Sequence, residues 1–180
     1  LDGSSLPGVP WELFSNEGST AVVDLGGGNS GLRMDSPAHS DAPGTHYNEY
    51  YSGTTGFGAT ELVGASRFRL ASFSPAGKEN LLSVTVGGAT PTAPSITLVD
   101  GNYWVWSYTS DGPILDLGPA VVDEFHTAYL LARNDGTAQV WWDGTFIFDG
   151  PVPVAPNYDG YVEFGSGTYW GTTAATVVDF

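Results

Sequence analysis

The stretch that decides the fold runs from residue 124 to 148 and reads EFHTAYLLARNDGTAQVWWDGTFIF. It contains three runs rich in β-branched and aromatic residues, separated by Asp135-Gly136 and Asp143-Gly144. An Asp-Gly or Asn-Gly pair between two such runs is the strongest short-range sequence signal for a β-hairpin. The stretch therefore predicts three consecutive antiparallel strands joined by tight turns.

The rest of the chain repeats this pattern, with short β-branched and aromatic runs between clusters of Gly, Pro, Asn and Asp. The further strands that we expect cover residues 20–25, 31–35, 66–73, 80–86, 95–99, 102–109, 160–164 and 174–180. No segment keeps an apolar period of 3.6 residues over the length of a capped helix. We therefore predict an all-β fold, a two-sheet antiparallel β-sandwich of the jelly-roll type, as one domain over residues 1–180.

The charge composition excludes several classes of function. The 180 residues include 20 Asp and Glu against 5 Lys and Arg, which gives a net charge of −15. Because a surface for nucleic acid or anionic lipid needs clustered Lys and Arg, we expect neither partner. No stretch reaches the ~18 apolar residues of a membrane-spanning helix, so we expect no membrane insertion. The composition favours an exported bacterial protein, secreted or at the cell surface.

The chain has no cysteine, which excludes a disulfide framework and thiolate chemistry. Acidity favours neutral or cationic ligands, and it suits bound Ca²⁺.

The C-terminal third resembles a known family. From Phe125 the chain reads FHTAYLLARNDGTAQVWWDGTFIF, followed by YVEFGSG and ATVVDF. This order of motifs is similar to the C-terminal half of a laminin-G-like domain of the concanavalin A-like lectin/glucanase superfamily. The resemblance implies a concanavalin A-like sandwich whose last strand usually continues past the position of Phe180. The superfamily contains lectins, carbohydrate-binding modules, hydrolases, lyases and adhesion modules, so the resemblance predicts the fold and leaves the function open.

Candidate carbohydrate-binding rings alternate along one expected strand. Trp104, Trp106 and Tyr108 occupy every second position of residues 102–109, so a strand would place the three rings on one face, about 6.6–7 Å apart. Sugars stack their C–H faces on such rings. The alternative is that these rings fill the space between the two sheets.

Polar candidates come from two other runs. Arg67 and Arg69 share one face of their strand, where they either clamp a carboxylate or sugar hydroxyls, or pair with the chain's own carboxylates. In residues 46–51, alternation puts His46 and Tyr50 on one face. His46, Tyr50 and Arg69 together also resemble the residues of a polysaccharide lyase, which needs a base and a group that neutralises the uronate.

Two further predictions concern single strands. Trp141 and Trp142 must face opposite sides of their strand, so one is expected in the core and the other on a sheet surface. We expect His126 to pack or to form a hydrogen bond, and not to act as a catalyst.

The resemblance also implies a structural calcium ion. Many members of the superfamily hold Ca²⁺ with an Asp in the last strand, which is Asp179 in this chain, together with an acidic residue near the N-terminus. Glu17 is the first candidate for that second ligand and Asp24 the next. Carboxylate oxygens are the hard ligands that Ca²⁺ prefers, so we predict calcium as a structural cofactor.

Known catalytic motifs are missing from the sequence. The E-x-D-x-x-E pattern, which sets two glutamates ~5 Å apart in retaining glucanases, occurs nowhere, and neither does G-x-S-x-G. Our interpretation is therefore a non-catalytic module that recognises carbohydrate. One alternative is a polysaccharide lyase or glycoside hydrolase on the same jelly roll. The other is a self-associating structural or adhesive subunit of a cell surface or filament.

Overall fold

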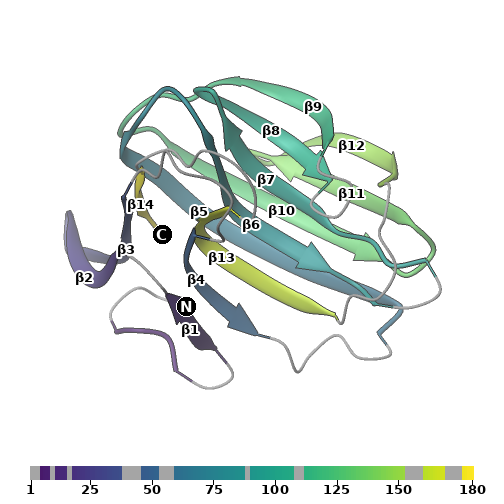
Figure 1. The fold of residues 1–180 in the computed structure, drawn as a ribbon, viewed down its shortest axis with the longest axis horizontal. Helices are drawn as coiled ribbons and strands as arrows, with labels where there is room; N and C mark the ends of the chain where they lie inside the picture. The colour runs from purple at the N-terminus through teal and green to yellow at the C-terminus, as the bar shows by residue number, and fades with distance from the viewer. Residues whose placement is uncertain are drawn as a thin grey trace.

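The computed structural model describes residues 5–8, 11–15, 18–37, 46–52, 59–87, 90–107, 112–152, 160–168 and 176–180, with backbone alone at Phe14 and at residues 46–48 and 166–168. In this part of the chain, fourteen β-strands form two sheets of seven, and every strand pairing is antiparallel. The predicted two-sheet all-β sandwich is confirmed (Figure 1).

The first sheet, called sheet A, has the order β1-β4-β13-β6-β7-β8-β9. Its strands are β1 (Glu12–Ser15), β4 (His46–Ser52), β13 (Tyr161–Thr168), β6 (Lys78–Thr85), β7 (Pro94–Val99), β8 (Asn102–Ser107) and β9 (Gly112–Pro119). The second sheet, called sheet B, has the order β12-β11-β10-β5-β14-β3-β2. Its strands are β12 (Thr145–Pro151), β11 (Thr137–Trp142), β10 (Phe125–Arg133), β5 (Glu61–Phe73), β14 (Thr176–Asp179), β3 (Asn29–Ser36) and β2 (Ser19–Gly26).

The stretch that decided the prediction forms β10, β11 and β12, which are neighbours at one edge of sheet B. Asp143 and Gly144 connect β11 to β12 with φ angles of 49° and 76°. Positive φ at both central residues defines a type I′ turn, whose twist matches that of a hairpin. The Asp-Gly pair therefore sets the register of this hairpin.

The core lies between the sheets and is built from alternate residues of the facing strands. Its largest members include Met34, Phe68, Leu70, Leu82, Leu98, Tyr103 and Leu130, all almost fully buried. Trp142 packs against this core, whereas Trp141 contacts Tyr129 and Phe146 on the other side of sheet B. The prediction that these two tryptophans divide between core and surface is confirmed.

His126 has the structural role that the sequence predicts. Its Nδ1 lies 2.8 Å from a carboxylate oxygen of Asp143, and its ring stacks on Trp142 at 4.6 Å.

The described residues include no helix long and apolar enough to cross a membrane.

Candidate functional site

Polar residues form a continuous row on the outer face of sheet A, the face turned away from sheet B. Phe164 belongs to the core, so its neighbour Glu163 faces outward. Residues directly opposite one another in antiparallel strands share a face. The register therefore places one residue from each of β4, β13, β6, β7 and β8 in the same row: Tyr51, Glu163, Ser83, Ser95 and Trp106. We call this set the polar row.

A second row runs beside it on the same face. Asn80 lies opposite Thr97, and Thr97 lies opposite Trp104. The hydroxyls of Thr97 and Ser95 are 3.0 Å apart, which joins the two rows by a hydrogen bond. The outer face of sheet A thus carries hydroxyl, amide, carboxyl and indole groups side by side.

These outward-facing polar groups are buried. Glu163 is 3% exposed and Glu49 2%, and the serine, threonine and asparagine residues of the two rows are equally shielded. Asn80 Oδ1 and Thr85 Oγ1 have no hydrogen-bond partner within the described part of the chain. Buried polar atoms are almost always paired in folded proteins, so an ordered water molecule or a polar ligand can complete these hydrogen bonds.

Two glutamates share this face. Glu49 lies opposite Gly165 in the β4–β13 pairing, which makes it the diagonal neighbour of Glu163 on the adjacent strand. Burial raises the pKa of Glu163 well above its ordinary value of 4.5, and the charge of Glu49 raises it further. A hydrogen bond from Asn80 Nδ2 to Glu163 Oε1, 2.9 Å long, and the nearby Ser83 offset part of this shift.

The consequence is a raised pKa at one carboxyl of the pair, that of Glu163. Glu163 keeps its proton at pH values where an exposed glutamate has lost it, so it can donate that proton. A carboxyl that keeps its proton beside a second carboxyl can take part in acid–base cleavage of a glycosidic bond.

The two predicted tryptophans belong to this face. Tyr103 and Val105 of β8 point into the core, so Trp104 and Trp106 point outward, where they are half-buried. Their ring centroids are 6.5 Å apart and their planes nearly perpendicular, at 86°. Lys78 Nζ lies 4.9 Å from the centroid of the Trp106 ring. The third predicted ring, Tyr108, lies outside the described residues.

Tyr50 does not belong to the outer face, so its predicted role is wrong. It is 3% exposed, and its ring stacks on Phe164 at 5.6 Å inside the core. Burial raises the pKa of its hydroxyl. The outward-facing residues of β4 are its neighbours Glu49 and Tyr51. The side chain of His46, the other predicted residue of β4, lies outside the described residues.

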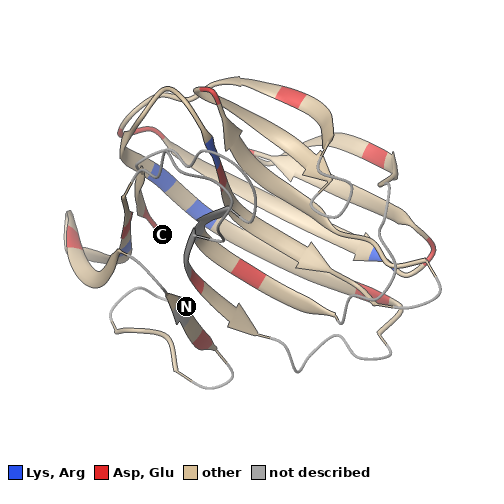
Figure 2. Cartoon of the chain, viewed as in Figure 1, with Lys and Arg blue, Asp and Glu red and all other residues tan. Residues whose placement is uncertain are grey.

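Arg67 and Arg69 do not join the tryptophans either. They lie on the outer face of sheet B, because the alternate residues of β5 fill the core. Figure 2 marks the few Lys and Arg positions in blue among the more numerous Asp and Glu positions in red. Both guanidinium groups lie over the ring of Phe125, at 4.0 and 5.1 Å. Arg69 also pairs with Asp179 at 3.0 Å and with Asp123 at 3.5 Å. The core therefore separates these arginines from Trp104 and Trp106, and the single predicted site that combined them is wrong.

Asp179, the predicted calcium ligand of the last strand, is held by two arginines. Its two carboxylate oxygens accept hydrogen bonds from Arg33 at 2.6 and 2.8 Å, and one of them accepts another from Arg69 at 3.0 Å. Burial by itself would raise the pKa of Asp179, but these hydrogen bonds outweigh it and lower the pKa. Two adjacent positive charges would repel Ca²⁺ from this carboxylate.

The remaining calcium candidates give no metal cluster in the described residues. Asp24 accepts a 2.7 Å hydrogen bond from the backbone N–H of Gly26 in the turn between β2 and β3. Glu17 lies outside the described residues. Nowhere in the described ranges do three or more His, Asp or Glu residues gather as metal ligands. Calcium at Asp179, Glu17 and Asp24 stays a prediction.

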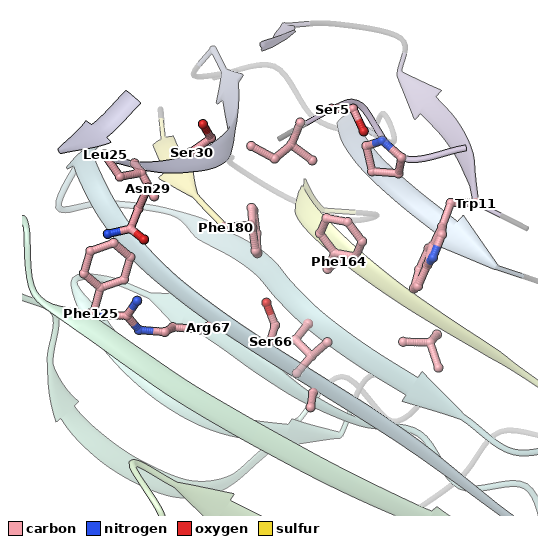
Figure 3. Close-up of a pocket in the computed structure, with 15 residues that line it drawn as sticks. Ser5, Trp11, Leu25, Asn29, Ser30, Ser66, Arg67, Phe125, Phe164 and Phe180 are labelled. Carbon is pink, nitrogen blue, oxygen red and sulfur yellow. The ribbon is translucent and has the colours of Figure 1, made fainter. Parts of the chain in front are cut away.

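A cavity of about 380 Å³ opens between β3 and β5, beside Phe180 (Figure 3). Its wall is mostly apolar and includes Trp11, Leu32, Leu82, Val162, Phe164 and Phe180. Among the described residues of its wall, the polar ones are serines, Asn29 and Arg67, and none of these described residues has a carboxylate side chain. A cavity of this kind offers no acid–base pair, so the outer face of sheet A remains the candidate for chemistry.

Comparisons with known proteins support the fold. No family model matches the sequence, and no curated protein matches it. Among solved structures, an endo-β-1,4-glucuronan lyase from the fungus Trichoderma reesei is similar, with a TM-score of 0.61 and 15% identity over 95% of this chain and 91% of that one. A carbohydrate esterase from the Shiga toxin-encoding bacteriophage phi24B gives a TM-score of 0.63 and 14% identity, over 94% and 86%.

A third similar structure is described as a native glycosidic hydrolase, with a TM-score of 0.58 and 14% identity over 100% of this chain and 94% of that one. At these identities the likeness establishes the architecture alone, an all-β jelly-roll sandwich of two antiparallel sheets. The same architecture thus carries three different carbohydrate reactions in these neighbours.

Sequence reasoning missed Glu49 and Glu163. Each is the single acidic residue of its strand. The two are 114 positions apart in the sequence, so no catalytic motif of fixed spacing includes both. The available signal was a single charged residue among aromatic and apolar neighbours, in NEYY and YVEF. Only the pairing of β4 with β13 shows that the two glutamates are neighbours.

Proposed function

We propose that this protein hydrolyses a polysaccharide on the outer face of sheet A, with Glu163 as the proton donor and Glu49 as the charged partner. The observation that carries the proposal is the buried carboxyl pair, in which the pKa of Glu163 is raised and Asn80 holds its Oε1. A carboxyl kept neutral by burial is suited to protonating a leaving group near neutral pH.

The length of the site supports a polymeric substrate. Glu163 and Trp106 belong to the same row and are separated by three strand spacings, or about 14 Å at ~4.8 Å each. A ligand that touches both must extend across the strands, with sugars stacked on Trp104 and Trp106 and the scissile bond at the glutamates. The carbohydrate enzymes among the similar structures also support this substrate class.

The proposed reaction follows from the two carboxyls. Glu163 donates its proton to the glycosidic oxygen as the bond from that oxygen to the anomeric carbon breaks. Glu49 stabilises the positive charge that develops at the anomeric carbon, and a water molecule supplies the hydroxyl that replaces the leaving sugar. The proton released by that water restores the acid, so the net change is addition of one water molecule.

The charges of the site favour hydrolysis over β-elimination. A lyase must neutralise the uronate carboxylate of its substrate. Glu49 and Glu163 lie on β4 and β13, near one edge of sheet A, whereas Lys78 Nζ lies against Trp106 of β8. A uronate bound at the glutamates would face an uncompensated negative charge.

The second candidate is recognition of carbohydrate without chemistry. The pair Trp104 and Trp106 favours it, because outward-facing indoles are sufficient for binding and require no acid. The two candidates share the binding face, so product formation separates them.

The test is incubation with neutral polysaccharides (cellulose, xylan, mixed-linkage β-glucan) and acidic ones (alginate, glucuronan), followed by measurement of reducing ends and of the ultraviolet absorbance of unsaturated uronates. We expect new reducing ends without that absorbance. Glu163→Gln should lower the rate by about 10²–10⁴-fold, the usual contribution of a general acid. Glu61→Gln, which changes an exposed glutamate of sheet B, is the matched control.

Unsaturated products would show elimination and contradict the hydrolytic mechanism. Retention on a polysaccharide without any product would leave the recognition function and refute the enzyme.

A further inference from the structure

A cluster of three aromatic rings lies on the outer face of sheet B, on the opposite side of the sandwich from the carboxyl pair. Tyr129, Trp141 and Phe146 come from the neighbouring strands β10, β11 and β12, and each lies directly opposite the next. The ring centroids are 4.9 Å apart for Tyr129 and Trp141, and 5.1 Å apart for Trp141 and Phe146. We call these three residues the aromatic patch.

The aromatic patch is accessible. Phe146 is 51% exposed and Tyr129 37%, and Val63 beside them is 41% exposed. On β5, the residue opposite Tyr129 is Ala65, whose small side chain leaves the patch open at that side. A contiguous exposed patch of large apolar side chains is uncommon on a soluble protein and marks an interaction surface.

Hydrogen-bonding groups border the rings. Two residues from Trp141 along β11, on the same face, Gln139 Nε2 donates to Asp149 Oδ2 at 2.9 Å. The Tyr129 ring stands at 89° to the Trp141 ring, so one ring presents its face where the other presents its edge and hydroxyl. Aromatic faces with a few flanking polar groups are the means by which proteins hold sugar rings.

The charge of the molecule decides between possible occupants. The patch residues are uncharged, whereas the chain as a whole carries −15. A second copy of the chain would bring another −15 to the interface, and a polyanion would be repelled in the same way. A neutral polymer meets no such repulsion.

We propose that the aromatic patch is a second carbohydrate-binding surface, which holds a neutral polysaccharide chain on the face opposite the carboxyl pair. It shares its ligand class with the proposed function and none of its residues. Such a surface keeps the protein on an insoluble substrate while the other face acts on a free chain.

The experiment measures retention on insoluble cellulose, insoluble xylan and β-1,3-glucan, by depletion of the protein from the supernatant. Binding is measured in the Glu163→Gln background so that the polymer is not consumed. We expect the double change Tyr129→Ala and Phe146→Ala to weaken retention on at least one polymer about tenfold. Val22→Ala, at a residue of β2 that is 41% exposed, should have no effect.

Activity is measured separately on soluble oligosaccharides in the wild-type background, and melting curves confirm that the variants fold. Loss of retention with unchanged turnover on soluble substrate supports the second surface. Loss of retention with no turnover in any variant supports the surface and refutes the proposed enzyme, so the two failures are distinguishable. Unchanged retention overturns the inference, as does a dimer in sedimentation velocity that the double change dissociates.

Discussion

Glu163 and Asp179 are both buried carboxyl groups, yet their surroundings shift their pKa values in opposite directions. Burial and the neighbouring Glu49 raise the pKa of Glu163, and the amide hydrogen bond from Asn80 offsets only part of that rise. Asp179 also loses its hydration, but Arg33 and Arg69 replace it with charged hydrogen bonds, and its pKa falls. The first arrangement keeps a proton on Glu163, whereas the second ties β14 to β3 and β5.

Glu163→Gln should therefore be more stable than the wild type, by an amount that grows as the pH rises. Because the folded pKa of Glu163 is raised, its contribution to stability is fully present below the unfolded pKa and is lost as the pH rises through the folded pKa. Glutamine does not titrate, so the variant gains up to about 1.4 kcal/mol for each unit by which the folded pKa is raised. Urea unfolding at a series of pH values measures this gain. A constant difference between variant and wild type would contradict it, and Glu61→Gln is the control.

Asp179→Asn should destabilise the protein at neutral pH. Removing one partner of a buried ion pair usually costs 3–5 kcal/mol, and we expect about 3 kcal/mol because Arg33 and Arg69 are partly exposed and can reach water. The lowered pKa means that this stability is present above the unfolded pKa and lost as the pH falls through the folded pKa. Urea unfolding at neutral and acidic pH should show the two proteins converging in acid. Equal stability at neutral pH would show that the ion pairs contribute nothing.

At the scale of the single strand, β4 and β8 show what a sequence pattern can and cannot predict. Alternation correctly separated Tyr50 from its neighbours Glu49 and Tyr51, and Trp104 and Trp106 from Tyr103. It could not show which face is the core, because both faces of these strands carry aromatic rings. The choice depends on contacts with sheet B, which are distant in sequence: Tyr103, for example, packs edge-on against Phe68 at 6.0 Å.

Adjacent substitutions in β8 should have opposite effects. Trp106→Ala should weaken retention on the polysaccharide without abolishing it, since the aromatic patch still binds the polymer, and it should cost only about 1 kcal/mol because this outward-facing ring is half-buried. Val105→Ala should retain binding and cost about 2 kcal/mol, because Val105 is fully buried in the core. Retention assays and urea unfolding of both variants measure the two effects. A large loss of stability in Trp106→Ala together with intact binding would place the ligand elsewhere.

At the scale of the whole molecule, the sequence was sufficient for the architecture and insufficient for the site. Hairpin turns such as Asp143-Gly144 are local, so they could be read from neighbouring residues. The carboxyl pair arises from β4 and β13, which adjoin only because the sandwich brings distant segments together. The arginines of β5 were wrongly joined to the tryptophans of β8 for the same reason, since no local pattern shows which sheet contains a strand.

The net charge of −15 predicts a dependence of stability on salt. Like charges spread over a small molecule repel one another, and salt screens that repulsion. Raising NaCl from about 10 mM to about 500 mM should increase the melting temperature by roughly a few degrees. Differential scanning calorimetry measures the change. A decrease would mean that screening of ion pairs such as Arg133 with Glu61 outweighs the relief of repulsion.

The protonation of Glu163 is the claim on which the proposed chemistry depends, and carbon NMR of the glutamate side-chain carboxyls measures it directly. The resonance absent from Glu163→Gln identifies the residue, and its chemical shift is followed as the pH is raised. We expect the midpoint of the Glu163 titration to lie well above 4.5 and above the midpoints of the other glutamates. A midpoint at or below 4.5 would mean that Glu163 is an ordinary ionised carboxylate, and the proton donor would be lost.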